Sequence, residues 1–252
     1  MDTIVTMILN RSKVTVEHIK ITQASPDTLH MSLVNRVTGT GPTSATMSPM
    51  VVDLVFGGVT WGKLQLPEVV TASGGTDVVV EEQEVKILDQ AAFRAFVKAL
   101  MLDDELVLTL DNGDCKISSK VLGFTAKSNV VYKKDLIIAG MRGPKVTLVE
   151  TAGGKNTMKV MNPSPLEIDH GVSLFDVKDG DEVVAELKGP LYIVRGNFDS
   201  TLDVTFKGKK VAPGTKVRLV GKGTEKESWM NETLKYINSE FEVSEQFASL
   251  SG

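Results

Sequence analysis

Alternation of apolar and polar residues with a period of two constrains the fold of this chain more than any other feature. Residues 202–206 read Leu-Asp-Val-Thr-Phe and residues 106–110 read Leu-Val-Leu-Thr-Leu. Such alternation indicates strands that bury one face and expose the other. Further runs rich in β-branched residues, which favour strands, occur at 78–80, 130–138, 146–149 and 191–194.

Turn sequences separate these runs. Gly57-Gly58, Gly153-Gly154 and Asp179-Gly180 each supply the positive φ that a tight hairpin requires. Asp111-Asn112-Gly113 predicts a further turn between two strands. Many short strands with turns roughly every 8–12 residues are typical of a β-sandwich or barrel.

Two segments follow a helical pattern instead. Asp89 is placed to cap a helix whose apolar face includes residues 93–101, which predicts a helix near 90–102. Thr224 and Glu227 have capping-box spacing before an apolar stripe, which predicts a C-terminal helix near 225–241. Each helix follows a set of strands, so we expect two related β-sandwich modules, 1–143 and 144–252, divided at the Gly-Met-Arg-Gly-Pro stretch.

Charge, cysteine content and hydropathy exclude several classes of protein. The 252 residues carry 28 basic and 32 acidic side chains, well mixed, which disfavours nucleic-acid binding. The single cysteine, Cys115, permits no intramolecular disulfide. The apolar run at residues 4–9 is too short for a signal peptide or a membrane span. We therefore expect a soluble cytoplasmic protein with no membrane span.

Motifs for familiar catalytic chemistry are missing from the sequence. The histidines His18, His30 and His170 are far apart and show no metal-ligand spacing, so no metal site is expected. No Gly-x-Ser-x-Gly elbow marks a nucleophile, and no glycine-rich phosphate loop implies a nucleotide. We expect no cofactor.

Two stretches resemble a known family. Residues 160–168, Val-Met-Asn-Pro-Ser-Pro-Leu-Glu-Ile, resemble the Asn-Pro signature of the water-stress and hypersensitive-response domain of late-embryogenesis-abundant-like proteins. Residues 56–67, Phe-Gly-Gly-x-x-Trp-Gly-Lys-Leu-x-Leu-Pro, together with 93–100 and 135–140, are similar to a fungal late-embryogenesis-like domain family of unknown function. The resemblance spans most of residues 1–240, although Asn35 in the first half lacks the following proline. It implies immunoglobulin-like β-sandwich modules, each with one accessory helix.

The resemblance extends to the cofactor-free hetero-Diels–Alderases of tropolonic sesquiterpenoid biosynthesis. It implies a cofactor-independent enzyme of fungal secondary metabolism that joins a hydrophobic terpene to a reactive quinone methide. Such a reaction needs positioning and a few hydrogen-bond donors rather than a nucleophile. The candidate catalytic donors are His18, Tyr132, Tyr192 and Arg195, and the candidate substrate-binding walls are Trp61 and Trp229. Core packing is the alternative role for each of these residues, and it is the commoner one for such side chains. If they do form a pocket, we expect it between the modules.

Two other functions fit the same residues. One is a non-catalytic late-embryogenesis-like protein that binds partners or protects against stress. The other is an adaptor that adds a strand at an exposed sheet edge, such as the hairpin over 191–207. The sequence leaves open the ligand, the oligomeric state and whether the chain is catalytic.

Overall fold

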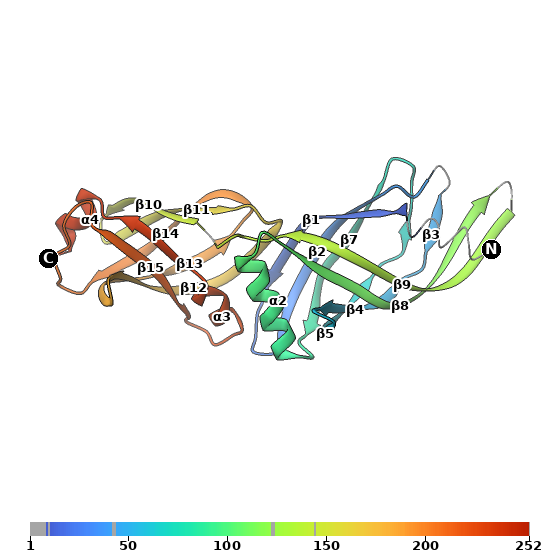
Figure 1. Cartoon of the computed structure of the whole chain (residues 1–252), viewed down its shortest axis with the longest axis horizontal. Helices are drawn as coiled ribbons and strands as arrows, with labels where there is room; N and C mark the ends of the chain where they lie inside the picture. Colours follow the sequence, from blue (N-terminus) through green and yellow to red (C-terminus); the bar gives the residue numbers. More distant parts are fainter. Residues whose placement is uncertain (1–8, 10, 42–43, 122–123, 144, 252) are drawn as a thin grey trace. The chain divides into compact units, whose positions relative to one another are not determined.

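The chain forms mainly β-structure, with 63% of residues in strands and 12% in helices. The computed structural model describes residues 9, 11–41, 44–121, 124–143 and 145–251 (Figure 1). The predicted fold class, a mainly β protein with sandwich-like sheets and few helices, is confirmed.

Two compact units make up the chain, and we describe each by itself. Unit 1 contains β1 (Lys13–Thr22) up to Ile21, together with Thr28–Phe96 and Leu106–Ile138. Unit 2 contains Ala139–Gly252 and two segments from earlier in the chain, Thr22–Asp27 and Val97–Glu105. The units are therefore not contiguous in sequence, and the modules expected over 1–143 and 144–252 stay a prediction.

Unit 1 is built from two groups of strands. In the first, β1 pairs with β2 (Thr28–Thr38), which pairs with β7 (Thr76–Lys86). The second has the order β5-β4-β8-β3-β6, with β9 on the other side of β8. Its strands are β3 (Ala45–Met47), β4 (Met50–Phe56), β5 (Val59–Leu66), β6 (Val69–Val70), β8 (Glu105–Val121) and β9 (Phe124–Ala139).

A side-chain amide links β5 to β7. The Gln65 N–H donates to Gln83 Oε1 at 2.7 Å, and Gln83 Nε2 donates to the Gln65 carbonyl at 3.4 Å. The side-chain amide of Gln83 thereby pairs with the backbone N–H and carbonyl of Gln65, as a residue of a neighbouring strand would. This contact satisfies backbone groups at a sheet edge, which otherwise invite pairing with another chain.

Aromatic side chains fill the core of unit 1 beside α2 (Gln90–Leu102). The Trp61 ring is fully buried, with centroid distances of 5.0 Å to Phe93 and 5.1 Å to Phe96. Asp89 caps the helix, because its Oδ1 accepts from the Ala92 N–H at 2.8 Å. The helix predicted near 90–102 and its cap are confirmed. The division between the two units falls within α2, after Phe96.

The turn predicted at Asp111-Asn112-Gly113 is wrong, because β8 continues through it. Asn112 adopts a left-handed conformation with φ of 56°, which asparagine tolerates better than most residues. The buried positions change from the even-numbered Leu106, Leu108 and Leu110 to the odd-numbered Cys115, Ile117 and Ser119. The sequence is therefore a bulge that shifts the alternation of β8 by one residue.

Unit 2 contains seven strands joined by antiparallel ladders in the order β10-β11-β14-β13-β12-β15-β16. Their bounds are β10 (Lys145–Ala152), β11 (Lys155–Asn162), β12 (Leu166–Asp179), β13 (Glu182–Ile193), β14 (Gly196–Phe206), β15 (Lys216–Thr224) and β16 (Asn238–Glu242). The hairpins predicted at Gly153-Gly154 and Asp179-Gly180 join β10 to β11 and β12 to β13, as expected.

The helix predicted over 225–241 is much shorter than expected. It comprises only α3 (Met230–Lys235), and the chain then forms β16 and α4 (Glu245–Leu250). Thr224 makes no capping box, because its N–H donates to the Asn231 side chain and its hydroxyl donates to the Lys226 carbonyl, both at 2.7 Å. Phe241 lies on β16 and is buried, and β16 forms a ladder with β15. Pairing with an open strand edge thus overrides the helical pattern.

The Asn-Pro signature has a structural role in unit 2. The Asn162 side chain is fully buried, and its Nδ2 donates to the carbonyls of Leu166 and Val194 at 2.7 and 3.2 Å. Its Oδ1 accepts from the Ser164 N–H at 3.0 Å. One amide therefore holds the loop between β11 and β12 against the end of β13.

Replacing this amide should destabilise unit 2. Asn162→Ala leaves the buried Leu166 carbonyl, the half-buried Val194 carbonyl and the Ser164 N–H without this partner, so we expect a loss of about 2–4 kcal/mol in the free energy of unfolding. Asn197→Ala, at an exposed position of β14, should change it by about 0.5 kcal/mol or less. Urea denaturation measures both. Equal effects of the two substitutions would contradict this role.

A buried histidine connects β12 to α3. Nε2 of His170 lies 2.9 Å from Oγ1 of Thr233, and that hydroxyl donates to the Met230 carbonyl at 2.7 Å. The hydroxyl proton is thus engaged, so Nε2–H of a neutral His170 donates to Thr233. Burial lowers the pKa of His170 to about 4.

The depressed pKa predicts acid sensitivity. Because an unfolded histidine takes up a proton at about pH 6.5 and the folded one only near pH 4, stability should fall as the pH drops through this window. The loss at pH 4 is on the order of 3 kcal/mol. Urea denaturation between pH 7 and pH 4.5 should show a shallower dependence for His170→Gln. The same slope for both proteins would exclude His170 as the cause.

Candidate functional site

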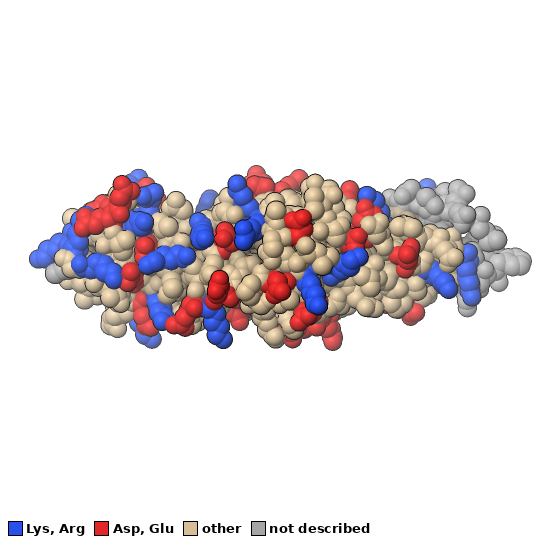
Figure 2. Space-filling view, turned by 90° about the horizontal axis from the view of Figure 1, so that it is seen from below, with Lys and Arg blue, Asp and Glu red and all other residues tan. Residues whose placement is uncertain are grey.

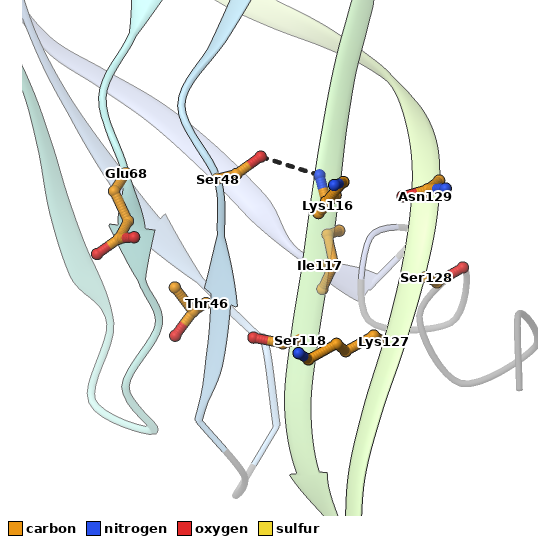
Figure 3. A pocket seen from close by; sticks show the side chains of 9 residues that line it. All are labelled: Thr46, Ser48, Glu68, Lys116, Ile117, Ser118, Lys127, Ser128 and Asn129. Carbon is orange, nitrogen blue, oxygen red and sulfur yellow. Dashed lines mark hydrogen bonds between the residues drawn. The ribbon is translucent and has the colours of Figure 1, made fainter.

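Two adjoining hollows lie on unit 1 over β3, β8 and β9. Their volumes are about 500 and 630 Å³, within the range of small-molecule sites. They share Ser48, Lys116 and Asn129, so we treat them together as the β8–β9 groove. The first is lined by Thr46, Ser48, Glu68, Lys116, Ile117, Ser118, Lys127, Ser128 and Asn129 (Figure 3). The second adds Asp114, Cys115, Val130 and Val131.

The bulge at Asn112 determines which side chains reach this groove. Beyond it, Lys116 is exposed and Ser118 half-buried, whereas Cys115 and Ile117 are buried. Without the shift, the alternation of the first half of β8 would place the even-numbered residues in the core. The bulge therefore places Lys116 and Ser118 on the face of β8 that lines the groove beside β9.

Ser48 fixes the backbone beneath the groove. The Lys116 N–H donates to Ser48 Oγ at 2.9 Å (Figure 3). The Ser48 N–H donates to the Lys116 carbonyl, also at 2.9 Å. Pro49, which lacks an N–H, separates β3 from β4 at this point. The serine side chain thus replaces one backbone partner and holds β8 where the strand beside it is interrupted.

The groove combines positive charge with an apolar wall. Within the described part of the chain, the ammonium groups of Lys116 and Lys127 have no ion-pair partner, and Glu68 adds one carboxylate. Apolar surface comes from Val131, which is 64% exposed and lines the second hollow. Ile117 lines the first hollow. A ligand could therefore gain hydrogen bonds to the lysines while covering exposed apolar surface.

Two ionisable groups near the groove are kept neutral. Burial raises the pKa of the Cys115 thiol, and the charge of Asp114 adds to the effect. Burial likewise raises the pKa of Tyr132 to about 12. Neither forms a reactive anion at neutral pH, so these groups favour non-covalent binding over nucleophilic attack.

The structure distributes the six predicted site residues over both units. In unit 1, Trp61 is a fully buried core residue, Tyr132 is buried, and His18 is half-buried on β1. In unit 2, Trp229 is buried beside α3 and Arg195 is exposed between β13 and β14. Of the described residues that line the β8–β9 groove, none belongs to this set.

Tyr192 makes the most specific contact among these six. It is 41% exposed on β13, and its hydroxyl donates to Glu167 Oε2 at 2.7 Å. Partial burial, together with this hydrogen bond, raises its pKa to about 12. The phenol stays protonated and can act as a donor, but the carboxylate already accepts its proton.

Surface charges are largely paired or mixed in sign. On the face that Figure 2 shows, basic and acidic side chains are interspersed and neither forms a continuous patch. In the densest basic stretch, Lys207 pairs with Glu186 at 2.6 Å and Lys209 with Glu182 at 2.6 Å. These carboxylates neutralise much of the field that a nucleic acid would need.

The described residues include no group of three or more His, Cys, Asp or Glu side chains placed to hold a metal ion. None of the helices among them has the length and apolar character needed to cross a membrane.

One family and several solved structures are similar to this chain. A family described as a protein of unknown function (DUF3712) matches residues 59–177. No curated protein matches the sequence.

The solved structures include the YadV chaperone, with 13% identity, coverage of 92% of this chain and 100% of that one, and a TM-score of 0.22. The E. coli chaperone DraB has 12% identity, coverage of 92% and 98%, and a TM-score of 0.21. Red sea bream transglutaminase has 12% identity, coverage of 93% and 31%, and a TM-score of 0.26. Similarities this distant carry no argument about function.

Proposed function

We propose that this chain is a small-molecule-binding protein that holds an amphipathic ligand in the β8–β9 groove by shape and hydrogen bonding. The observation that carries this proposal is that Lys116 and Lys127, whose ammonium groups have no ion-pair partner among the described residues, line the same groove as the exposed apolar side chain of Val131. Small-molecule sites commonly combine an apolar wall with a few polar groups that set orientation.

Local rigidity supports binding at this place. The Ser48 contacts fix the backbone of Lys116, and the bulge at Asn112 fixes which face of β8 it joins. A site whose backbone is already ordered loses less conformational entropy when a ligand binds. The raised pKa of Cys115 agrees with a ligand that is held rather than attacked.

A fluorescent probe, 7-hydroxycoumarin, tests this proposal, because it joins a flat apolar ring system to hydrogen-bonding oxygens. Val131→Asp should weaken its binding about tenfold, since a charge would replace the apolar wall. The matched control is Val79→Asp, another exposed valine of unit 1 on β7, and it should leave the affinity unchanged. Fluorescence titration measures both, and equal weakening by the two substitutions would exclude the groove.

A second function, cofactor-free hetero-Diels–Alder cycloaddition, is favoured by the same two lysines. The Lys116 and Lys127 ammonium groups would stabilise a carbonyl oxygen that gains negative charge during the reaction. Val130 and Val131, which line the second hollow, would cover the hydrocarbon reactant. Holding both reactants together lowers the entropic part of a bimolecular barrier. This chemistry needs neither the thiol nor a metal.

The cycloaddition proposal predicts a specific loss of rate. With a quinone methide and a terpene alkene as reactants, Lys116→Ala/Lys127→Ala should slow product formation about a hundredfold, as removal of transition-state donors does elsewhere. Lys86→Ala, an exposed lysine of β7, is the control and should keep the full rate. Liquid chromatography of the products measures it. If wild-type protein gives the rate and product ratio of the protein-free mixture, the chain is not a cycloaddition catalyst.

A further inference from the structure

The strand order of unit 2 leaves a seam between its first and last strands. Six successive antiparallel ladders connect seven strands, so β10 and β16 must run in the same direction. The two strands lie beside each other, but their described residues form no ladder. A ladder between them would have to be parallel, unlike the six antiparallel ladders of this unit. We call it the β10–β16 seam.

A hollow of about 400 Å³ opens at the start of both strands. Arg142 and Lys145 provide two cations, and Thr147, Tyr236 and Ser239 provide hydroxyl groups. The one carboxylate in the lining, Glu240, already pairs with Lys216 at 3.1 Å. The hollow is therefore rich in donors, and its single acid is neutralised.

The backbone on both sides of Arg142 is held firmly. The Met141 N–H donates to the Leu100 carbonyl and the Gly143 N–H to the Met101 carbonyl, both at 2.8 Å. Between these contacts the backbone of Arg142 adopts a φ of 59°, a conformation that residues other than glycine rarely take. Such an outlier persists only where surrounding contacts impose it, and it often marks a functional position.

The carboxylate of Asp104 contacts the guanidinium of Arg142 through Nε. Its Nε lies 3.1 Å from Asp104 Oδ1, and this contact leaves the two Nη groups available. A planar guanidinium in this state can bind two oxygens of one anion at the same time. Lys145, which has no ion-pair partner among the described residues, adds a second charge.

We propose that the hollow at the β10–β16 seam binds a compact oxyanion, such as the phosphate group of a small molecule. Two Nη groups of Arg142 would take two oxygens of the anion, and Lys145 and the hydroxyl groups would take the others. The strand edges also contribute, because backbone N–H groups that no ladder uses can donate to an anion. This site belongs to unit 2 and is independent of the groove proposed on unit 1.

Inorganic phosphate, titrated at constant ionic strength with chloride as the reference anion, tests the proposal. Amide NMR shifts should change saturably at residues 142–143, 145–147 and 236–240. Arg142→Gln and Lys145→Gln should each raise the Kd for phosphate about tenfold, the factor typical of losing one charge-assisted contact. The matched control Lys155→Gln, at an exposed position in β11, should leave it unchanged.

Each outcome decides the question. Binding that Lys145→Gln weakens and Lys155→Gln does not would support the site even if Arg142→Gln failed to fold, because Lys145 carries no backbone strain. Shifts no larger than those with chloride would overturn the proposal, as would equal effects of Lys145→Gln and Lys155→Gln. Phosphate shifts confined to unit 1 would overturn it as well, and they would leave the unit 1 groove to be judged by its own titration.

Discussion

Antiparallel pairing with strictly alternating side chains is the constraint on which this structure depends. Every ladder sends one set of residues into a core and the other to the surface, and a shift of one residue exchanges the two sets. Both proposed sites lie where this regularity is broken. In unit 1 the left-handed Asn112 shifts the alternation of β8, and in unit 2 the neighbouring strands β10 and β16 form no ladder among the described residues.

Large aromatic residues pack against one another in both units. Trp61 lies against Phe93 and Phe96, and Phe206 lies against Phe247 at 5.0 Å. Aromatic contacts of this kind add to the stabilisation from burial alone. The hollows on which both proposals rest are lined instead by lysine, hydroxyl and valine side chains.

Periodicity was enough to predict much of the fold. Strands at 106–110 and 202–206, the hairpin glycines and the helix capped by Asp89 follow from local physics, since alternation and capping need only neighbouring residues. The sequence around Asn112 could not be resolved in the same way, because Asp-Asn-Gly suits a hairpin and a bulge equally well. The apolar residues after Thr224 were assigned to one helix, but they belong first to a short helix and then to a strand. The strand forms because its residues pair with the edge of β15, and this contact is not visible in the local sequence.

The groove residues carried little signal in the sequence. In the sequence, Lys116, Ser118 and Lys127 resemble ordinary surface positions. The bulge in β8 and the pairing of β8 with β9 bring them to one place. The Asn-Pro signature shows the opposite case, since a conspicuous motif has a structural role through the buried Asn162. Trp61 and Trp229 were singled out by residue type, which does not distinguish a core residue from a pocket wall.

An amide NMR map of bound 7-hydroxycoumarin tests the central claim most directly, namely that the shifted face of β8 forms a ligand site. The account predicts that the largest shifts fall at residues 46, 48, 114–118 and 127–131, which line the groove. Shifts centred instead on His18, Tyr192 or Arg195, or no saturable shifts at all, would contradict it.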